Sequence, residues 1–276
     1  MFRTCSLFLP AVVTLLVLCV GVYSAPVEQK YDTLVAPSLF EGDIAGIAPR
    51  GGFKSSDELS AAISRNGIRS GKWPGGRMYY RISDNFNSTE RQVIVGAIAE
   101  INGNVSHFSL IRRTNEIHYV DILRGAPQTG CYSYIGTVGG RQVLNLEAPV
   151  APRDPHCIRH GIVVHELMHA VGFYHEQSRT ERDNFVEVNF PNIAQSKWHN
   201  FQSYETHQVT NFSQPYDYDS LMHYGRFDFA NDRTVWTIRA KGDVQGKIKI
   251  GQRYGLSPID ILKMNAMYTG LEKKLN

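Results

Sequence analysis

Three histidines and a glutamate at fixed spacing constrain this chain more than any other feature. They lie in the segment HELMHAVGFYHE, which runs from position 165 to position 176. A helix from about Ile162 to Val171 places His165 and His169, four positions apart, on the same face. A helix presents two nitrogen ligands to one zinc ion in this way. Glu166 then lies beside the metal, where its carboxylate can take a proton from a bound water.

The residues after this helix supply the rest of the predicted metal site. Gly172 ends the helix, because glycine accepts the left-handed backbone conformation of helix ends. The chain can then turn back and bring in His175 as the third ligand. Three protein ligands leave one tetrahedral position for water, which indicates a catalytic zinc site with one ion per chain. The opposing interpretation is a chance His-Glu-x-x-His with packed histidines, and the glycine and third histidine argue against it.

The first residues form a targeting segment. Arg3 precedes an apolar run from Leu7 to Val22, and the small residues Ser24 and Ala25 follow. This pattern predicts a signal peptide over residues 1–24, and hence a secreted, extracellular protein. The run is too short for a membrane anchor and no second apolar run follows, so we expect no membrane partner.

Cysteine usage agrees with export. Cys5 and Cys19 leave with the signal peptide, so the mature chain keeps Cys131 and Cys157. An oxidising compartment would pair these two. The alternative, a zinc site, is poor because neither belongs to a Cys-x-x-Cys. Three sequons are candidate glycosylation sites, at Asn87, Asn104 and Asn211.

Charge separates the residues that follow the signal peptide from the rest of the chain. The formal net charge is +3, which calls for no nucleic-acid partner. Residues 25–65 hold four basic and six acidic side chains and lack long periodicity, whereas the remainder is basic. An acidic, loop-like segment suits a pro-segment lying on its own enzyme. We therefore expect a pro-segment at 25–65 and a catalytic domain at 66–276.

Hydrophobic patterns predict an α+β catalytic domain. A capping pattern of Thr89 with Gln92 starts a helix, whose apolar face is Val93, Ile94, Ala97, Ile98 and Ile101. β-rich segments are expected to form strands of one sheet: Met78–Ile82, Phe108–Arg112, Ile117–Leu123, Cys131–Ile135 and Val143–Leu146.

Beyond His175 the chain is expected to be largely irregular until a final helix. That helix is signalled by Ser257, Pro258 and Asp260, and Leu262, Ala266 and Met267 would dock it. A short helix is also possible at Ser56–Ile63 in the pro-segment.

Several segments together resemble the astacin family of zinc metalloendopeptidases, within the metzincin clan. They are HELMHAVGFYHEQSRTER from position 165, YDYDSLMHYG from 216, IGQRYGLSPIDILKMNAMY from 250, and the shorter CYSYI and WPGG. The likeness covers roughly residues 66–268. It implies a two-subdomain zincin fold, with the active-site helix above a cleft and a largely irregular lower half.

The resemblance also implies roles for single residues. Met222 would form an apolar floor beneath the zinc, and Tyr224 would bind the resting zinc and then swing away to hydrogen-bond the oxyanion. Glu176 would hold the new amino terminus after cleavage near Asn66. In the segment FEGDI, Asp43 resembles the aspartate that binds the zinc in the zymogen, and a surface Gly-Asp turn is the alternative.

The disulfides depart from the family pattern. Cys131–Cys157 matches the inner disulfide of astacins, whereas the outer one would need cysteines near Val105 and Gly270. Both are missing, so no unpaired thiol is left, and we expect a less constrained fold.

The sequence thus predicts a secreted zinc endopeptidase made as a zymogen. His165, His169 and His175 would hold the metal, Glu166 would move the proton, and Tyr224 would stabilise the oxyanion. Its partners would be protein or peptide substrates and an activating protease, and we expect a monomer. Two alternatives remain: a catalytically silent binding glycoprotein on the same fold, and another metzincin branch such as a matrixin, against which Glu176 and Tyr224 argue.

Overall fold

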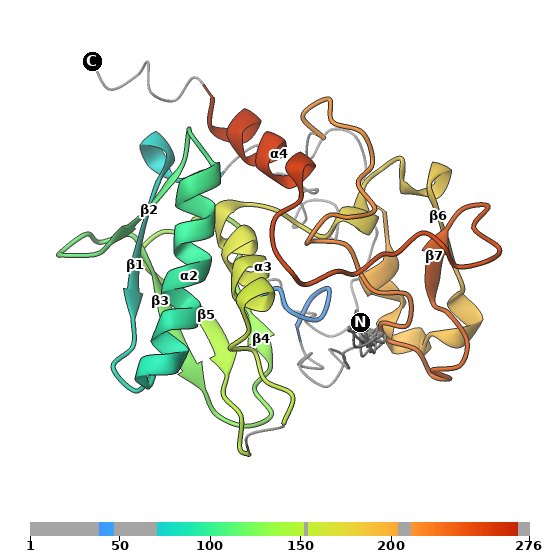
Figure 1. Cartoon of the computed structure of the whole chain (residues 1–276), viewed down its shortest axis with the longest axis horizontal. Coiled ribbons are helices and arrows are strands. Elements are labelled where there is room, and N and C mark those ends of the chain that lie inside the picture. Colours follow the sequence, from blue (N-terminus) through green and yellow to red (C-terminus); the bar gives the residue numbers. More distant parts are fainter. Residues whose placement is uncertain (1–38, 47–70, 152–153, 204–210, 270–276) are drawn as a thin grey trace, which may run out of the picture.

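The structure is a computed structural model that describes residues 39–46, 71–151, 154–203 and 211–269. The expected signal peptide and the short helix expected at 56–63 lie outside these residues. The described chain forms two halves, one on each side of residues 39–46 (Figure 1). Residues 71–171 build a sheet covered by two helices, and most later residues form the second half.

The first half is organised by a five-stranded sheet, preceded by the short 3-10 helix η2 (Pro74–Gly76). Its strands are β1 (Arg77–Ile82), β2 (Ser109–Arg112), β3 (Tyr119–Gly125), β4 (Cys131–Tyr132) and β5 (Arg141–Glu147). Their order is β2-β1-β3-β5-β4, and only β4 is antiparallel to its neighbour. All five predicted strands are present in one sheet, as expected.

Helix α2 (Ser88–Asn104) covers one face of this sheet beside the histidine helix (Figure 1). Its predicted apolar face is confirmed, since Ile94, Ala97, Ile98 and Ile101 are buried and Val93 packs against the same core. The predicted cap was wrong. Asn87, not Thr89, accepts a hydrogen bond from the backbone N–H of Glu90, and the Glu90 carboxylate accepts one from the backbone N–H of Asn87.

Helix α3 (His160–Val171) carries the first two histidines and is almost wholly buried. It begins two residues before the predicted start and ends at the predicted glycine. Gly172 has φ 132°, and its N–H donates to the carbonyls of Met168 and His169. A glycine accepts this conformation without the steric cost of a side chain, so the chain can leave the helix towards His175.

The disulfide joins the sheet to the approach to α3. Cys131 of β4 is bonded to Cys157, with the two Cα atoms 5.6 Å apart. Val105, where the family resemblance would place a cysteine, is instead buried in the apolar core. Apolar packing takes the place of a covalent link at this position.

The second half is mostly irregular, as expected. Its described residues hold one two-stranded sheet, formed by β6 (Val186–Val188) and β7 (Ile238–Ala240), and four short 3-10 helices: η3 (Glu176–Ser178), η4 (Arg182–Asn184), η5 (Phe190–Asn192) and η6 (Gln195–Phe201).

Helix α4 (Pro258–Tyr268) has the predicted cap, in which Ser257 and Asp260 exchange hydrogen bonds. The predicted docking face was partly wrong, because Leu262 is 50% exposed and Ala266 is exposed too. Lys263, Met264, Met267 and Tyr268 are buried instead. A polar network beneath the helix, described below, sets this rotation, which apolar periodicity alone does not reveal.

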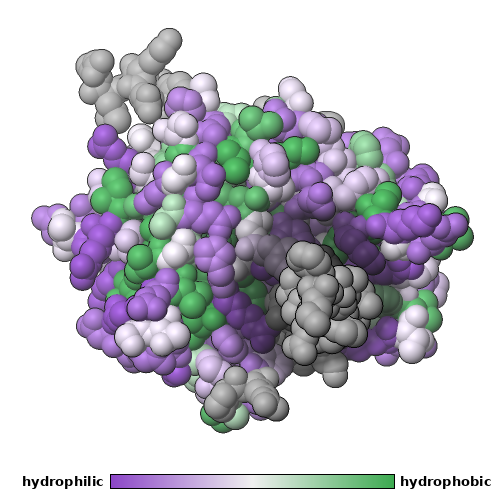
Figure 2. All heavy atoms as spheres, in the orientation of Figure 1, coloured by the Kyte–Doolittle hydropathy of each residue, from purple (hydrophilic) through white to green (hydrophobic). Residues whose placement is uncertain are grey.

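The surface is mixed in character. On the face shown in Figure 2, hydrophilic side chains predominate along the outer edges, and apolar side chains lie among them over the first half. Within the described residues, no helix combines the length and apolar character needed to cross a membrane.

Candidate metal centre

Three histidine side chains converge at the junction of the two halves. His165 and His169 come from α3, and His175 directly precedes η3. All three are buried, and their ring centroids lie 4.8 to 5.2 Å apart. Nε2 of His165 and Nε2 of His175 are separated by 3.3 Å. The predicted turn after Gly172 therefore brings the third ring to the first two.

The opposite ring nitrogens are each held by an acceptor. Nδ1 of His165 lies 2.9 Å from the carbonyl oxygen of Leu221, and Nδ1 of His169 lies 2.6 Å from that of Phe173. Nδ1 of His175 lies 2.6 Å from Oε2 of Glu41. Because these oxygens can only accept, each Nδ1 donates its hydrogen, and the Nε2 atoms face the common centre.

Asp43 completes the group. Its Oδ2 lies 3.1 Å from Nε2 of His165 and 3.3 Å from Nε2 of His175, and its Oδ1 lies 3.5 Å from Nε2 of His169. One ligand atom from each of the four residues lies within 4.8 Å of every other.

This arrangement fits a zinc ion. Ligands about 2.0–2.1 Å from a tetrahedral zinc lie about 3.3 Å from one another, close to the separations found here. Among the described residues, the buried atoms Nε2 of His169 and Oδ1 of Asp43 have no hydrogen-bond partner. A buried polar atom without a partner is costly, and a shared cation would satisfy both. The donor set of imidazole and carboxylate is one that zinc accepts.

The charges at this centre influence one another strongly. Burial would raise the pKa of Asp43, but His175 and His169 hold it well below its usual range. Burial would lower the pKa of His175, but the carboxylates of Asp43 and Glu41 raise it to about 9. Burial, with a contribution from Arg253, lowers the pKa of His165 to about 3. Asp43 therefore carries its negative charge at the centre of the histidines.

A tight turn delivers Asp43 to the histidines. In residues 39–46, called here the leader turn, Phe40 and Ile44 exchange backbone hydrogen bonds of 3.1 and 2.9 Å. Glu41 and Gly42 take left-handed φ values of 46° and 88°. The conformation is unfavourable for a non-glycine residue, so the contacts made by Glu41 must offset its cost. Phe40 and Ile44 are buried beside it.

Glu41 contacts the site and was missed by the sequence reasoning. Its Oε2 accepts from Nδ1 of His175, its Oε1 accepts from the Ser178 hydroxyl at 2.7 Å, and its carbonyl accepts from the Tyr224 hydroxyl at 2.7 Å. The available signal was its place in the FEGDI segment, two residues before Asp43.

Glu166 lies on α3 next to His165 and is 1% exposed. Its Oε2 has no hydrogen-bond partner among the described residues. Burial and the neighbouring carboxylate of Asp43 raise its pKa well above the usual range. This carboxyl group therefore binds a proton more tightly than an exposed glutamate does.

Tyr224 lies at the other side of the histidines. Its ring centroid is 4.6 Å from that of His175, and the rings of Phe201 and Phe229 pack against it at 5.4 Å. Burial and the carboxylate of Glu41 raise its pKa well above the usual value. Its hydroxyl therefore stays protonated and able to donate a hydrogen bond.

The segment around Met222 adjoins the site through the carbonyl of Leu221, which lies 2.9 Å from Nδ1 of His165. Met222 is wholly buried, and its carbonyl accepts from the backbone N–H of Glu176 at 3.0 Å. Asp260 of α4 accepts from the Ser220 hydroxyl at 2.7 Å and from the backbone N–H of Leu221 at 2.8 Å. Helix α4 thus fixes the loop whose carbonyl, that of Leu221, orients His165.

Glu176 is paired with two cations. Its Oε1 lies 2.8 Å from Nη1 of Arg179 and its Oε2 lies 2.5 Å from Nζ of Lys263, and all three side chains are buried. The backbone N–H of Asp217 donates to the same carboxylate at 3.0 Å. Residue 66, the expected new amino terminus, lies outside the described residues. Sequence reasoning missed both partners, although Arg179 is only three positions away.

The three sequon asparagines lie on the surface and use their side chains locally. Asn87 caps α2, Asn104 donates to the carbonyl of Glu100, and Asn211 donates to the carboxylate of Glu181.

Comparison with known proteins identifies the domain. The family model described as "Astacin", a peptidase family, matches residues 66–269. The chain belongs to the astacin family. Residues 66–269 are accordingly a zinc metalloendopeptidase domain that takes one zinc ion, with protein or peptide substrates.

Individual astacins agree with this assignment. Zinc metalloproteinase nas-4 of Caenorhabditis elegans is 35% identical over 230 residues, covering 83% of this chain and 68% of that protein. The low choriolytic enzyme of Oryzias latipes is 37% identical over 236 residues, covering 83% and 78%. High choriolytic enzyme 1 of the same fish, a hatching enzyme zinc-protease, superimposes with a TM-score of 0.62 at 37% identity, covering 71% of this chain and 92% of that chain.

Other astacins are longer. The matched region spans only 40% of zinc metalloproteinase nas-15 and 50% of nas-13, both from Caenorhabditis elegans.

Proposed function

We propose that this astacin is a secreted endopeptidase made as a latent zymogen, with Asp43 as the group that blocks the metal. One observation carries the proposal: a carboxylate from the leader turn lies within 3.1 to 3.5 Å of the Nε2 atoms of all three histidines. In this arrangement His165, His169 and His175 hold the zinc, and Asp43 takes the fourth position that substrate chemistry needs.

The chemistry follows from groups around that position. Zinc, when bound, acts as a Lewis acid that polarises the scissile carbonyl and lowers the pKa of the attacking water. Glu166 takes the proton from that water and delivers it to the leaving amine. Glu166 suits this role by position, since it lies next to His165 on α3 and its buried Oε2 has no hydrogen-bond partner among the described residues.

Tyr224 is assigned to the oxyanion of the substrate. Its hydroxyl donates to the carbonyl of Glu41 in the latent form. Removal of the leader turn leaves that donor without its acceptor, beside the centre where the oxyanion develops. The leader turn then keeps the enzyme latent in two ways. It occupies the fourth metal position, and it holds the Tyr224 hydroxyl in a hydrogen bond.

The edge strand β4 is assigned to substrate binding. The leader turn already pairs with Ser133, the residue directly after β4: the N–H of Ala45 donates to the carbonyl of Ser133 at 2.8 Å, and the N–H of Ser133 donates to the carbonyl of Asp43 at 3.0 Å. An extended substrate would replace these bonds along residues 131–135, since an exposed sheet edge accepts an added strand.

Activation would require cleavage of the link between residues 46 and 71. We place the signal peptide at 1–24, the pro-segment at 25–65 and the catalytic domain at 66–276, and assign the cut to an activating protease. The apolar run from Leu7 to Val22, the disulfide Cys131–Cys157 and the three sequons support passage through an oxidising secretory route. The new amino terminus would then join Arg179 and Lys263 around the Glu176 carboxylate.

The decisive experiment is Glu166→Gln in the processed enzyme. Hydrolysis of an unstructured protein should fall by about 10²–10⁴-fold, the usual contribution of a general base, while zinc content stays at one per chain. Glu187→Gln, which changes a surface glutamate of β6, is the matched control and should keep full activity. A processed, zinc-loaded wild type without activity would instead favour the silent binding glycoprotein.

A further inference from the structure

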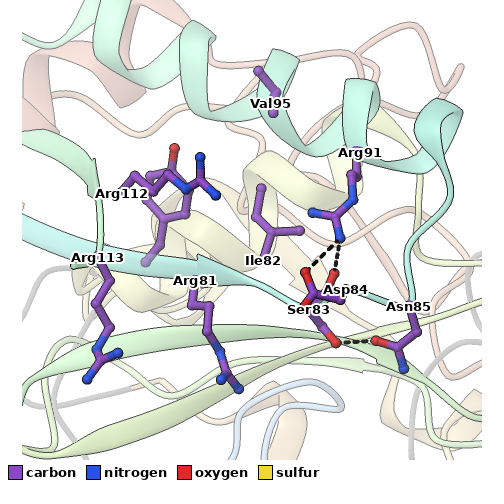
Figure 3. A pocket seen from close by; sticks show the side chains of 10 residues that line it. Arg81, Ile82, Ser83, Asp84, Asn85, Arg91, Val95, Arg112 and Arg113 are labelled. Carbon is purple, nitrogen blue, oxygen red and sulfur yellow. Dashed lines mark hydrogen bonds and ion pairs between the residues drawn. The ribbon is translucent and has the colours of Figure 1, made fainter. Parts of the chain in front are cut away.

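A second pocket lies at the edge of the sheet between β1, β2 and α2. It encloses about 770 Å³ and is lined by four arginines, Arg81, Arg91, Arg112 and Arg113, with Asp84 as the only acid among its lining residues (Figure 3). A pocket of this size can hold several groups of a ligand.

The pocket is separate from the metal centre. It lies at β2, one edge of the sheet, whereas the leader turn and its histidines adjoin β4, the opposite edge. Three strands separate the two edges, which at about 4.8 Å per strand spacing places them roughly 19 Å apart. A ligand here would anchor the enzyme without occupying the cleft.

Two of the arginines keep unused donors despite their local partners. Arg81 binds Asp121 through Nε and Nη2, and its side chain is 52% exposed. Arg91 donates through Nη2 to the carbonyl of Ser83 at 2.7 Å and to the exposed carboxylate of Asp84 at 3.4 Å. A guanidinium has five N–H donors, so each can still bind an oxyanion.

Arg112 and Arg113 place charge on both sides of the edge strand. Arg113 donates through Nε to the carbonyl of Glu116 and lies over the ring of Tyr119. Arg112 is exposed, and within the described residues its guanidinium makes no hydrogen bond or ion pair. Figure 3 shows Arg81 and Arg113 pointing the same way, with Arg91 and Arg112 on the other side of the strands.

The floor of the pocket is apolar. Tyr80 and Ile82 of β1 face α2, and Val95 of α2 is 53% exposed above them. Cations around an apolar floor suit a ligand that carries anionic groups on a ring-shaped body, because the ring can lie on the floor while the anions meet the guanidiniums.

The backbone at this edge is partly blocked. The side chain of Asn102 in α2 accepts from the N–H of Leu110 at 2.8 Å and donates to its carbonyl at 2.9 Å. These outward groups of β2 are therefore satisfied, which opposes the addition of a peptide strand. Recognition has to come from the side chains, and their spread over both sides of the strand suits a chain with repeated charges.

We propose that this arginine pocket binds a sulfated polysaccharide. Successive sulfates would meet Arg91 and Arg112 on one side of the edge and Arg113 and Arg81 on the other, with a sugar ring over Tyr80. Guanidinium groups match the oxygens of sulfate with paired hydrogen bonds. The proposal is independent of catalysis and predicts the same binding before and after activation.

The test measures binding of the full secreted chain to a size-defined heparin oligosaccharide by calorimetry, at several salt concentrations. Arg112→Ala should weaken binding about tenfold, because one charge-assisted contact is lost, and should reduce the salt dependence. Arg112→Glu should weaken it further. Arg233→Ala removes an exposed arginine of the other half and is the matched control.

Both Arg112 variants should keep the wild-type melting temperature and, once processed, cleave a short peptide at the rate of processed wild type. Three results would overturn the proposal: no heparin binding by wild type, equal weakening by Arg233→Ala, or equal competition by poly-L-glutamate. The last result would assign the pocket to acidic peptides instead.

Discussion

Oδ2 of Asp43 lies 3.1 Å from Nε2 of His165, a residue 122 positions further along the chain. The contact joins a turn that precedes the catalytic domain to the first residue of its zinc motif. It places a negative charge at the centre of three imidazoles, where substrate would otherwise approach. Four consequences of the site and the fold can be measured.

Asp43→Ala should weaken latency. Without the carboxylate, the fourth metal position opens while the rest of the leader turn stays in place. We expect the unprocessed, zinc-loaded variant to cleave a short peptide at least about tenfold faster than unprocessed wild type. This factor corresponds to a loss of about 1.4 kcal/mol in the free energy with which the leader turn blocks the site.

The double variant Asp43→Ala, Glu166→Gln shows whether this activity is the chain's own, and it should be inactive. Equal latency of Asp43→Ala and wild type, at equal zinc content, would mean that Asp43 is not the blocking ligand.

Tyr224→Phe tests the oxyanion donor. The hydroxyl is lost while the ring keeps its packing between His175, Phe201 and Phe229. For the processed enzyme we expect kcat to fall by about 10²-fold with little change in KM, because the donor acts mainly in the transition state. A change in KM alone would assign the hydroxyl to substrate binding instead.

Lys263→Met tests the buried ion pair with Glu176. Nζ lies 2.5 Å from Oε2, and both side chains are at most 1% exposed. Removing Lys263 leaves the carboxylate with one cation, Arg179, so the free energy of unfolding of the zinc-loaded chain should fall by about 3 kcal/mol. Chemical denaturation measures this.

Lys241→Met is the control, since Lys241 is exposed and, within the described residues, its Nζ donates to the carbonyl of Asp183 and to no carboxylate. A fall for Lys263→Met no larger than that of the control would show that Arg179 and the backbone N–H of Asp217 satisfy Glu176 without Lys263.

Asp121→Asn should change the acid limb of the stability profile. Asp121 is buried on β3 between Arg81 and Arg141, each 2.6 Å away. Burial would raise its pKa, but the two arginines hold the pKa below the ordinary 3.8. Because the folded-state pKa lies below the unfolded one, the stabilisation is present above about pH 4 and is lost as pH falls through the folded-state pKa.

The half-exposed arginines limit the effect, so we expect the variant to be about 1–2 kcal/mol less stable at pH 7 and to lose less stability on acidification. Thermal melts between about pH 2.5 and 7 cover the range in which Asp121 titrates and measure it. Parallel pH profiles of variant and wild type would contradict the assignment.

The sequence predicted the parts of this fold that depend on neighbouring residues. β-rich composition predicted the five strands, the apolar spacing predicted the buried face of α2, and the backbone freedom of glycine predicted the end of α3 at Gly172. The cap of α2 was misplaced by two residues because Asn87 and Thr89 are both acceptable capping residues, and only the observed backbone decides between them. The predicted docking face of α4 was partly wrong because that helix packs on a polar network.

By itself, then, the sequence determined the donor set: three imidazoles at fixed spacing, a glutamate beside the first, and an aspartate in the leader. Only the tertiary structure decided that Glu41 orients His175, that Lys263 pairs with Glu176, and that four arginines surround one pocket. The physical reason is separation along the chain. The spacing of the histidines is set by one helix and one turn, whereas the other contacts join segments whose meeting depends on how the whole core packs.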